Sequence, residues 1–216
     1  MILGLDISTT KIGVAILSDP IDSPLNVNGS VISKQRRELL LSEYWDLDTK
    51  KYPDMESKME VVMAELSTIR SKYNITDVYV EEHIKGTRHH KWNNNIRILL
   101  QLAMFNALVR WACYDLLEVK AIPVAASKVR ASYGISFPRR AKSPERKKLV
   151  VQSVIENEGD KFDWSFNRNG VNYATGVDDR ADAVVVARFG EQDIKLRDDR
   201  PFLTEKLSAE NISNIS

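Results

Sequence analysis

The chain has 216 residues, which is enough for one domain with a sizeable core. Apolar residues make up 43% of it and charged residues 28%, a balance that excludes a disordered or fibrous protein. The formal net charge is +1, so any affinity for nucleic acid must come from a local basic cluster rather than from the whole molecule.

The single cysteine, Cys113, excludes an internal disulfide and favours a reducing compartment. Its apolar neighbours predict a buried structural thiol. The N-terminus does not have the sequence of a secretory signal, and no apolar run approaches the roughly 18 residues of a membrane span. We therefore expect a soluble protein of the cytoplasm, or of the host cytoplasm if the chain is viral.

The first part of the chain predicts strands followed by a helix. Residues 2–7 and 12–17 are two apolar strands joined by a polar turn. Residues 19–43 are rich in proline, asparagine, serine and charge, which predicts a long loop with one short strand near 29–32. A strand, a helix and a second strand are then expected at 43–47, 55–74 and 78–82.

The second part predicts mainly helices. They are expected at 94–117, 125–133, 143–157 and 178–189, with one strand at 119–123. Early strands followed by alternating helices and strands predict an α/β domain, residues 1–192, around one mixed sheet. Residues 193–216 are polar and are expected to form a loosely held tail.

Four carboxylates occupy positions that apolar surroundings should not tolerate. Asp6 lies inside the first strand and Glu81 ends another, where a buried charge costs several kcal/mol unless it is compensated. Asp179 and Asp182 are three residues apart at the start of the last helix and therefore share a face. Acids from two strands and one helix can converge on divalent metal ions.

Two magnesium or manganese ions would suit such a set, because both metals prefer hard oxygen ligands. Two ions about 4 Å apart can clamp an in-line displacement at phosphorus, which is the chemistry of phosphodiester cleavage. Each acid also has an ordinary interpretation. Asp6 fits a bulge, Glu81 and Glu82 fit a solvated strand end, and Asp178 and Asp179 fit a helix cap. Asp182, among small apolar residues, is the hardest to explain in that way.

Several segments, in order along residues 1–190, together resemble RuvC-type Holliday-junction resolvases of the RNase H-like superfamily. They are residues 4–13, 80–84, 124–130, 147–151 and the sequence Asp-Arg-Ala-Asp-Ala at 179–183. The resemblance implies an RNase H-like fold with a mixed five-stranded sheet flanked by helices. It also implies a homodimeric endodeoxyribonuclease that cuts four-way junctions with two Mg²⁺ ions, for which Mn²⁺ can substitute.

By position, the resemblance assigns metal binding and catalysis to Asp6, Glu81, Asp179 and Asp182. Glu82 and Asp178 fall outside the pattern, and Lys142 or Lys147 matches a basic residue that is typical of the family. Family members often place an aromatic wedge three residues after the catalytic glutamate, where this chain has Ile84. The specificity can therefore extend to other branched DNA, as in some phage relatives.

Basic residues flank the acids along the sequence and are expected to bind DNA phosphates. They are Lys85, Arg88 and Lys91 after Glu81, and Lys128, Arg130, Arg139, Arg140, Lys142, Lys147 and Lys148 further on. A solvated charged face is the alternative interpretation. Trp92 is a candidate wedge that stacks on a base at the branch point, or else a structural anchor under the long helix.

Other functions remain open at this point. The opening strand and turn also resemble the phosphate loop of actin-like sugar kinases, although no second glycine-rich phosphate segment is present. An inactive branched-DNA-binding protein is a third class. His83, His89 and His90 could form a zinc site with Glu82, but their spacing fits no common pattern.

The long predicted helix also suggests how two copies would associate. It carries an apolar stripe of Ile98, Leu102, Phe105 and Val109. If Met104, Leu108 and Trp111 also pack inward, the stripe exceeds what one sheet face needs. We therefore expect a two-fold dimer through this helix.

Overall fold

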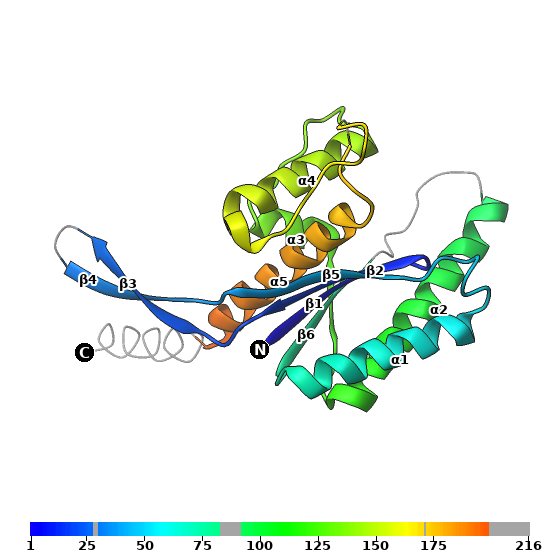
Figure 1. Ribbon diagram of the computed structural model, residues 1–216, viewed down its shortest axis with the longest axis horizontal. Coiled ribbons are helices and arrows are strands. Elements are labelled where there is room, and N and C mark those ends of the chain that lie inside the picture. The colour runs from blue at the N-terminus through cyan, green and yellow to red at the C-terminus, as the bar shows by residue number, and fades with distance from the viewer. Residues whose placement is uncertain (28–29, 83–91, 171, 199–216) are drawn as a thin grey trace, which may run out of the picture.

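A computed structural model describes residues 1–27, 30–82, 92–170 and 172–198. Five strands form one mixed sheet in the order β5-β2-β1-β6-β7 (Figure 1). They are β1 (Ile2–Ile7), β2 (Lys11–Leu17), β5 (Leu39–Asp46), β6 (Asp77–Glu82) and β7 (Ile122–Ala125). β2 is antiparallel to β1 and β5, whereas β6 is parallel to β1 and β7. The expected mixed five-stranded sheet of an α/β fold is confirmed.

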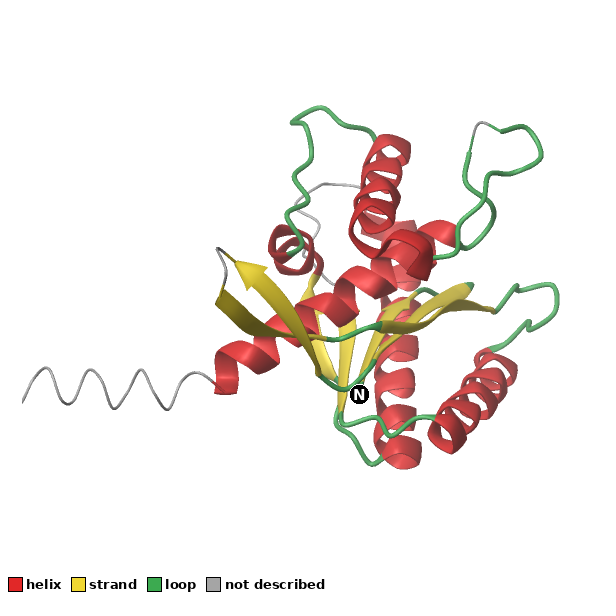
Figure 2. Cartoon of the chain, turned by 60° about the vertical axis from the view of Figure 1, so that its left-hand side comes forward, coloured by secondary structure: helices red, strands yellow, loops and turns green. Residues whose placement is uncertain are grey.

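Helices cover both faces of this sheet (Figures 1 and 2). They are α1 (Met55–Lys72), α2 (Trp92–Leu117), α3 (Ala126–Ser132), α4 (Ser143–Glu158) and α5 (Val177–Asp198), with a short 3₁₀ turn at Gly159–Lys161. α1 and α2 pack on one face, and α5 lies across the other with α3 and α4 packed on it. Because side chains alternate along a strand, each strand contributes to both cores.

Glycines allow α5 to lie directly on the strands. A Cβ on Gly4 would lie 2.6 Å from the carbonyl oxygen of Ala183, and one on Gly13 would lie 2.0 Å from that of Asp179. Real Cβ atoms do not approach so closely, so only glycine fits at these two positions. The first turns of α5 are thereby held against β1 and β2.

The predicted long loop at 19–43 is wrong. β3 (Ile21–Val27) and β4 (Ser30–Arg36) form a separate two-stranded antiparallel sheet, and β5 already begins at Leu39. These two strands pair with each other and not with the central sheet. Their polar, proline-containing sequence does not have the apolar pattern on which strand prediction depends.

The last predicted strand and the last predicted helix also have different bounds. β7 spans Ile122–Ala125 rather than 119–123, and its Pro123 is tolerated because β7 is an edge strand. α5 continues to Asp198, so residues 193–198 are helical and do not belong to a loose tail. Arg197 donates to the Tyr79 hydroxyl at 2.6 Å and forms an ion pair with Asp193 on the same helix, which ties this end to β6. Residues 199–216 lie outside the described part.

The expected packing of α2 is wrong in part. Phe105 and Val109 are buried in the core, but Ile98 is 61% exposed. Exposed apolar side chains also include Leu100, Met104, Leu108, Trp111 and Tyr114. The segment Ile96–Leu117 is long and apolar enough on average to cross a membrane by length and composition alone, although polar residues such as Asn106 and Arg110 interrupt it. Only 22% of its most apolar stretch is buried, so α2 presents a large uncovered apolar surface.

Candidate active site

Two of the four predicted acids are neighbours because of strand register. Leu5 on β1 pairs with Val80 on the parallel strand β6, so Asp6 and Glu81 follow side by side at the same end of the sheet. Leu5 and Val80 belong to the core under α1 and α2. Alternation therefore directs Asp6 and Glu81 to the opposite face, which α5 covers.

α5 supplies the other two acids. Asp179 and Asp182 lie in its first two turns, which the glycine contacts seat on β1 and β2 next to Asp6. The negative charge of Asp6 raises the pKa of both Asp179 and Asp182, which reflects this proximity. Four carboxylates from two strands and one helix therefore meet at one end of the sheet.

Arg130 on α3 bridges two of these acids. Its Nη2 donates to Oε1 and Oε2 of Glu81 at 3.1 and 3.4 Å, and to Oδ1 of Asp182 at 3.4 Å. Only 2% of the Glu81 side chain is exposed, so its charge needs a partner of this kind. The interaction with Glu81 and Asp182 keeps the pKa of Arg130 above its ordinary value, although burial opposes this.

The acids repel one another strongly. Burial raises the pKa of Asp182, and the negative charges of Asp6 and Glu81 raise it further, while Arg130 opposes the rise. Burial and then the charge of Asp178 raise the pKa of Asp179. A cation bound between these acids would offset their mutual repulsion and favour their charged forms.

Two lysines lie around the first turn of α5. Lys11, at the start of β2, has its Nζ 3.7 Å from Oδ2 of Asp179. Lys147 on α4 donates a short hydrogen bond to Asp178. That hydrogen bond and the nearby acids hold the pKa of Lys147 above its ordinary value, although its partial burial opposes this. Asp178 therefore engages α4, whereas Asp179 faces Asp6 and Lys11.

The four carboxylates form a candidate site for a divalent metal ion. Within the described ranges, no three His, Cys, Asp or Glu side chains already have the spacing of a formed metal site. The chemistry of the donors nevertheless fits magnesium or manganese. The donors are carboxylates alone, their mutual repulsion is large, and the guanidinium of Arg130 already lies between two of them.

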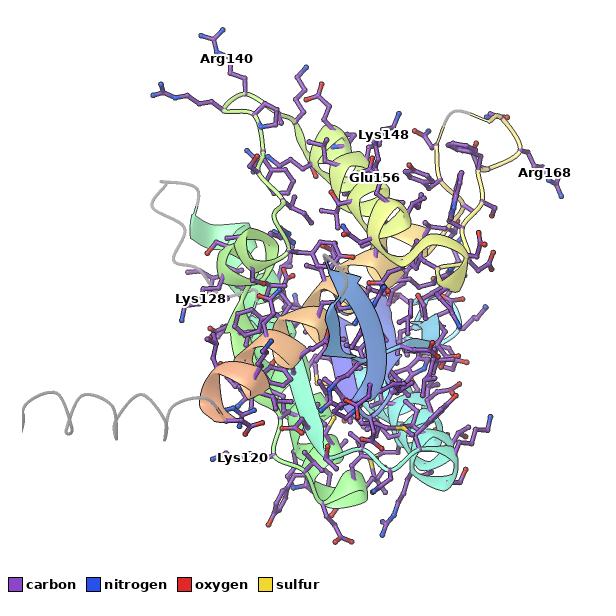
Figure 3. The ribbon with its side chains drawn as sticks, turned by 90° about the vertical axis from the view of Figure 1, so that its left-hand side faces the viewer. Lys120, Lys128, Arg140, Lys148, Glu156 and Arg168 are labelled. Carbon is purple, nitrogen blue, oxygen red and sulfur yellow. The ribbon has the colours of Figure 1, made fainter. Side chains whose placement is uncertain are left out.

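Most of the predicted DNA-binding residues that the structure describes are exposed. Lys128, Arg139, Arg140, Lys142 and Lys148 are exposed. Figure 3 shows Arg140 and Lys148 near α4 at one end of the molecule and Lys128 lower down. Arg130 was expected to face DNA but instead binds the acids, because Glu81 is buried and needs a cation.

Several predicted residues belong to the segment between β6 and α2 or to the first turn of α2. Lys85, Arg88, Lys91, Ile84 and the three histidines lie outside the described residues. Trp92 begins α2, but its side chain is likewise not described. The wedge and zinc-site hypotheses therefore stay predictions.

Sequence reasoning missed the roles of Lys11 and Arg130 at the acids. Both residues lie within the segments that resembled RuvC-type enzymes, so their basic character was visible. Which acid each one contacts depends on contacts across 49 or more residues of sequence, between Glu81 and Arg130 and between Lys11 and Asp179. A pattern of neighbouring residues in the sequence cannot predict contacts over such distances along the chain.

Comparison with known structures shows which fold this order of strands and helices has. The structure of T. thermophilus RuvC in complex with a Holliday junction substrate matches with a TM-score of 0.54 and 13% sequence identity, over 86% of this chain and 89% of that chain. A second Thermus thermophilus RuvC structure matches with a TM-score of 0.54 and 12% identity, over 88% and 95% of the two chains. The chain has the fold of RuvC.

The predicted resemblance to RuvC, and with it the RNase H-like fold, is thus confirmed at the level of structure. The yeast mitochondrial Holliday junction resolvase Ydc2 is also similar, with a TM-score of 0.45 and 17% identity over 86% of this chain and 75% of that chain. No protein-family model matches the chain, and no curated protein matches it in sequence. At such low identity the likeness to RuvC concerns the fold alone.

Proposed function

We propose that the chain is a metal-dependent endonuclease that cuts phosphodiester bonds at four-way DNA junctions and at other branched DNA. The observation that carries this proposal is the meeting of Asp6, Glu81, Asp179 and Asp182 at one end of a RuvC-like sheet. A structural role does not account for four carboxylates at one place, where burial and neighbouring negative charges raise the pKa of both Asp179 and Asp182. RuvC, whose fold the chain has, is a protein whose structure is known with a Holliday junction substrate.

In this proposal the four acids would hold two Mg²⁺ or Mn²⁺ ions, which when bound supply the charge that activates water and stabilises the leaving oxygen at phosphorus. The chain's own cations prepare the site. Arg130 keeps Glu81 and Asp182 oriented, and Lys11 orients Asp179. Lys147 stands next to Asp178 and can contact a phosphate of the bound strand.

The proposed active form is a homodimer, because a junction has two strands to cut. The exposed apolar side chains of α2 favour this helix as the contact between copies. A monomer rarely exposes so many large apolar residues on one helix without a partner. The cytoplasmic location expected from the single cysteine stays a prediction.

A sugar-kinase function is less well supported. In such a function the turn after β1 would bind phosphate through backbone amides. Here the Ser8 hydroxyl accepts from the amide of Lys11 at 3.0 Å and donates to its carbonyl oxygen at 2.8 Å. The turn therefore satisfies its own amide, and the Lys11 side chain is directed to Asp179.

The test is a cleavage assay on a synthetic four-way junction with Mg²⁺ or Mn²⁺, run beside a linear duplex of the same sequence. We expect paired nicks near the branch point for the wild-type protein and at least a hundredfold slower cleavage for Asp6→Asn, Glu81→Gln and Asp182→Asn. The amide variants should still bind the junction, because each removes a negative charge near phosphate. Near wild-type cleavage by Asp6→Asn would contradict the proposal, as would ATP turnover with a sugar in place of cleavage.

A further inference from the structure

Between α4 and α5 the chain forms a small hairpin that the proposed chemistry does not use. We call residues 162–176, of which 171 is not described, the aromatic hairpin. Phe166 and Tyr173 form an antiparallel bridge within it. The amide of Asn167 donates to the carbonyl of Asn172 at 2.7 Å, and the amide of Ala174 donates to that of Ser165 at 2.8 Å. These bonds hold residues 165–167 against residues 172–174.

Three aromatic rings pack on one another at the surface of this hairpin. Phe166 and Tyr173 are stacked, with ring centroids 5.2 Å apart and an interplanar angle of 8°. Trp164 meets both rings edge-on, at 5.4 and 6.1 Å. Trp164 is nevertheless 39% exposed and Phe166 is 50% exposed. The rings therefore hold one another in place while Trp164 and Phe166 stay partly exposed to solvent.

The base of the aromatic hairpin is tied to the acid-bearing end of the sheet. Phe162 is buried, and the guanidinium of Arg180 lies 5.3 Å from its ring centre. Gly176 packs so tightly on the ring of Tyr44 that a Cβ there would lie 2.2 Å away. The Tyr44 ring in turn lies 5.9 Å from Nζ of Lys11, the partner of Asp179. The hairpin is thus joined through Tyr44 to the candidate active site.

The chemistry around the rings favours one kind of ligand. Figure 3 shows Arg168 pointing outward from the hairpin, in the upper part of the view, where Lys148 of α4 also lies. Partly exposed aromatic rings on a hairpin that also carries an arginine suit a nucleobase and its phosphate, because every base presents an aromatic face. Two exposed rings are far too small an area for a stable protein interface.

We propose that the aromatic hairpin is a second DNA-binding site, on which Trp164 and Phe166 stack an unpaired base of the strand held at the acids. The proposal rests on the proposed function, since it takes DNA at the four carboxylates as its starting point. Arg168 contacts a phosphate of the same strand. The hairpin then holds DNA beside the reacting bond by contacts that do not depend on sequence.

The first test uses the wild-type protein and therefore does not depend on a variant that folds. Junctions carrying 5-iododeoxyuridine at successive positions near the branch point are bound in Ca²⁺, irradiated and digested. We expect cross-links on the peptide that contains Trp164, Phe166 and Tyr173, because the iodinated base reacts with aromatic rings that it stacks on. Cross-links found elsewhere only would overturn the proposal.

The second test measures junction affinity in Ca²⁺ for Trp164→Ala/Phe166→Ala, with Leu196→Ala at the far end of α5 as the matched control. Loss of one stacked base should weaken binding about tenfold. The dependence of affinity on salt should stay as in wild type, whereas Arg168→Gln should reduce its slope by about one. The control variant should bind like wild type.

The outcomes separate the inference from the proposed function. If wild type cuts the junction and the double variant melts at the wild-type temperature yet binds equally well, the second site does not exist. If the double variant instead changes the oligomeric state in sedimentation, the hairpin contacts another copy of the chain and the proposal is overturned. A wild-type protein that neither binds nor cuts branched DNA contradicts the proposed function, and the inference falls with it.

Discussion

The two faces of the central sheet pack against their helices in different ways. On the α1 and α2 face, side chains such as Leu5, Val80 and Phe105 fill the interface and carry no charge. On the α5 face, Gly4 and Gly13 allow direct contact between helix and strand backbones. That closeness brings the acidic side chains of Asp6 and Asp182 together at one end, where burial and the charge of Asp6 raise the pKa of Asp182.

The difference between the two faces shows where this fold can hold charged side chains at a low cost in stability. An interface filled by large side chains excludes polar groups, because an unpaired polar group there costs several kcal/mol. An interface closed by glycines and alanines contributes less apolar burial, but it leaves room at its end for acids and for Arg130. We expect stability to depend mainly on the first face and activity on the second.

Phe105→Ala should cause the largest loss of stability. Its side chain is 1% exposed on the α2 face, so truncation leaves a cavity and should lower the free energy of unfolding by about 3–5 kcal/mol. Met104→Ala, next to it but 59% exposed, is the control. Urea unfolding at one protein concentration measures both, and sedimentation should show that only Met104→Ala weakens self-association without destabilising the fold. If Phe105→Ala and Met104→Ala lost equal stability, the first face would not be the main source of stability.

Gly13→Ala should affect both stability and activity. Replacing a glycine inside a strand by alanine normally stabilises the protein. Here the new Cβ would instead clash with the carbonyl oxygen of Asp179. We expect a loss of about 3 kcal/mol from overpacking, with a marked drop in cleavage because Asp179 is displaced. Gly134→Ala is the control, since nothing lies within 4 Å of its position, and its φ of 79° predicts a loss of about 1–2 kcal/mol with unchanged cleavage. Full activity in Gly13→Ala would contradict the seating of α5 described above.

Arg130→Gln should destabilise the metal-free protein by about 2 kcal/mol. Breaking a buried ion pair costs about 3–5 kcal/mol, and the lower value allows for the 26% exposure of the Arg130 side chain. Adding Glu81→Gln should restore at least half of the loss, because the uncompensated charge is then removed. Mn²⁺ should raise the Tm of Arg130→Gln more than that of wild type, since it replaces the missing charge. A double variant less stable than Arg130→Gln would show that packing, not charge, explains the loss.

Cys113 on the apolar face gives the smallest effect, which depends on pH. Burial raises the pKa of its thiol from 9.0 to about 12. Below pH 9 both folded and unfolded thiols are protonated, whereas between pH 9 and 12 only the unfolded thiol ionises, so stability is lost as pH rises. The stability of wild type relative to Cys113→Ala should therefore fall by about 1 kcal/mol from pH 9 to 10. A constant difference in urea unfolding across that range would mean that the thiol reaches solvent.

Local patterns predicted the elements that carry the acids. The alternation of side chains between the two faces of β1 and β6 can be recognised within each short segment. Because the two strands are parallel neighbours, this alternation brings Asp6 and Glu81 together. The sequence also showed that apolar residues recur at helical spacing along α2. Such spacing predicts which residues share a face of the helix, but not which surface that face packs against. Phe105 therefore proved to be a core residue, whereas Ile98 proved to be exposed.

Three features could not be predicted because they depend on distant contacts. The bridging position of Arg130 requires α3 to lie beside the end of β6. The β3–β4 pair and the aromatic hairpin are built from backbone hydrogen bonds and ring contacts among residues that composition alone marks as loop. The metal and DNA roles of the site residues remain predictions for the experiments above.

The β3–β4 pair has a practical consequence. It joins the ends of β2 and β5 at Leu17 and Leu39, whereas Asp6 lies at the opposite end of β1 from Ile2, the partner of Leu17. A fluorophore or an affinity peptide carried by this extension would report on the protein from a position remote from the acids. Single-molecule observation of junction processing could then use a labelled protein whose reacting end is chemically untouched.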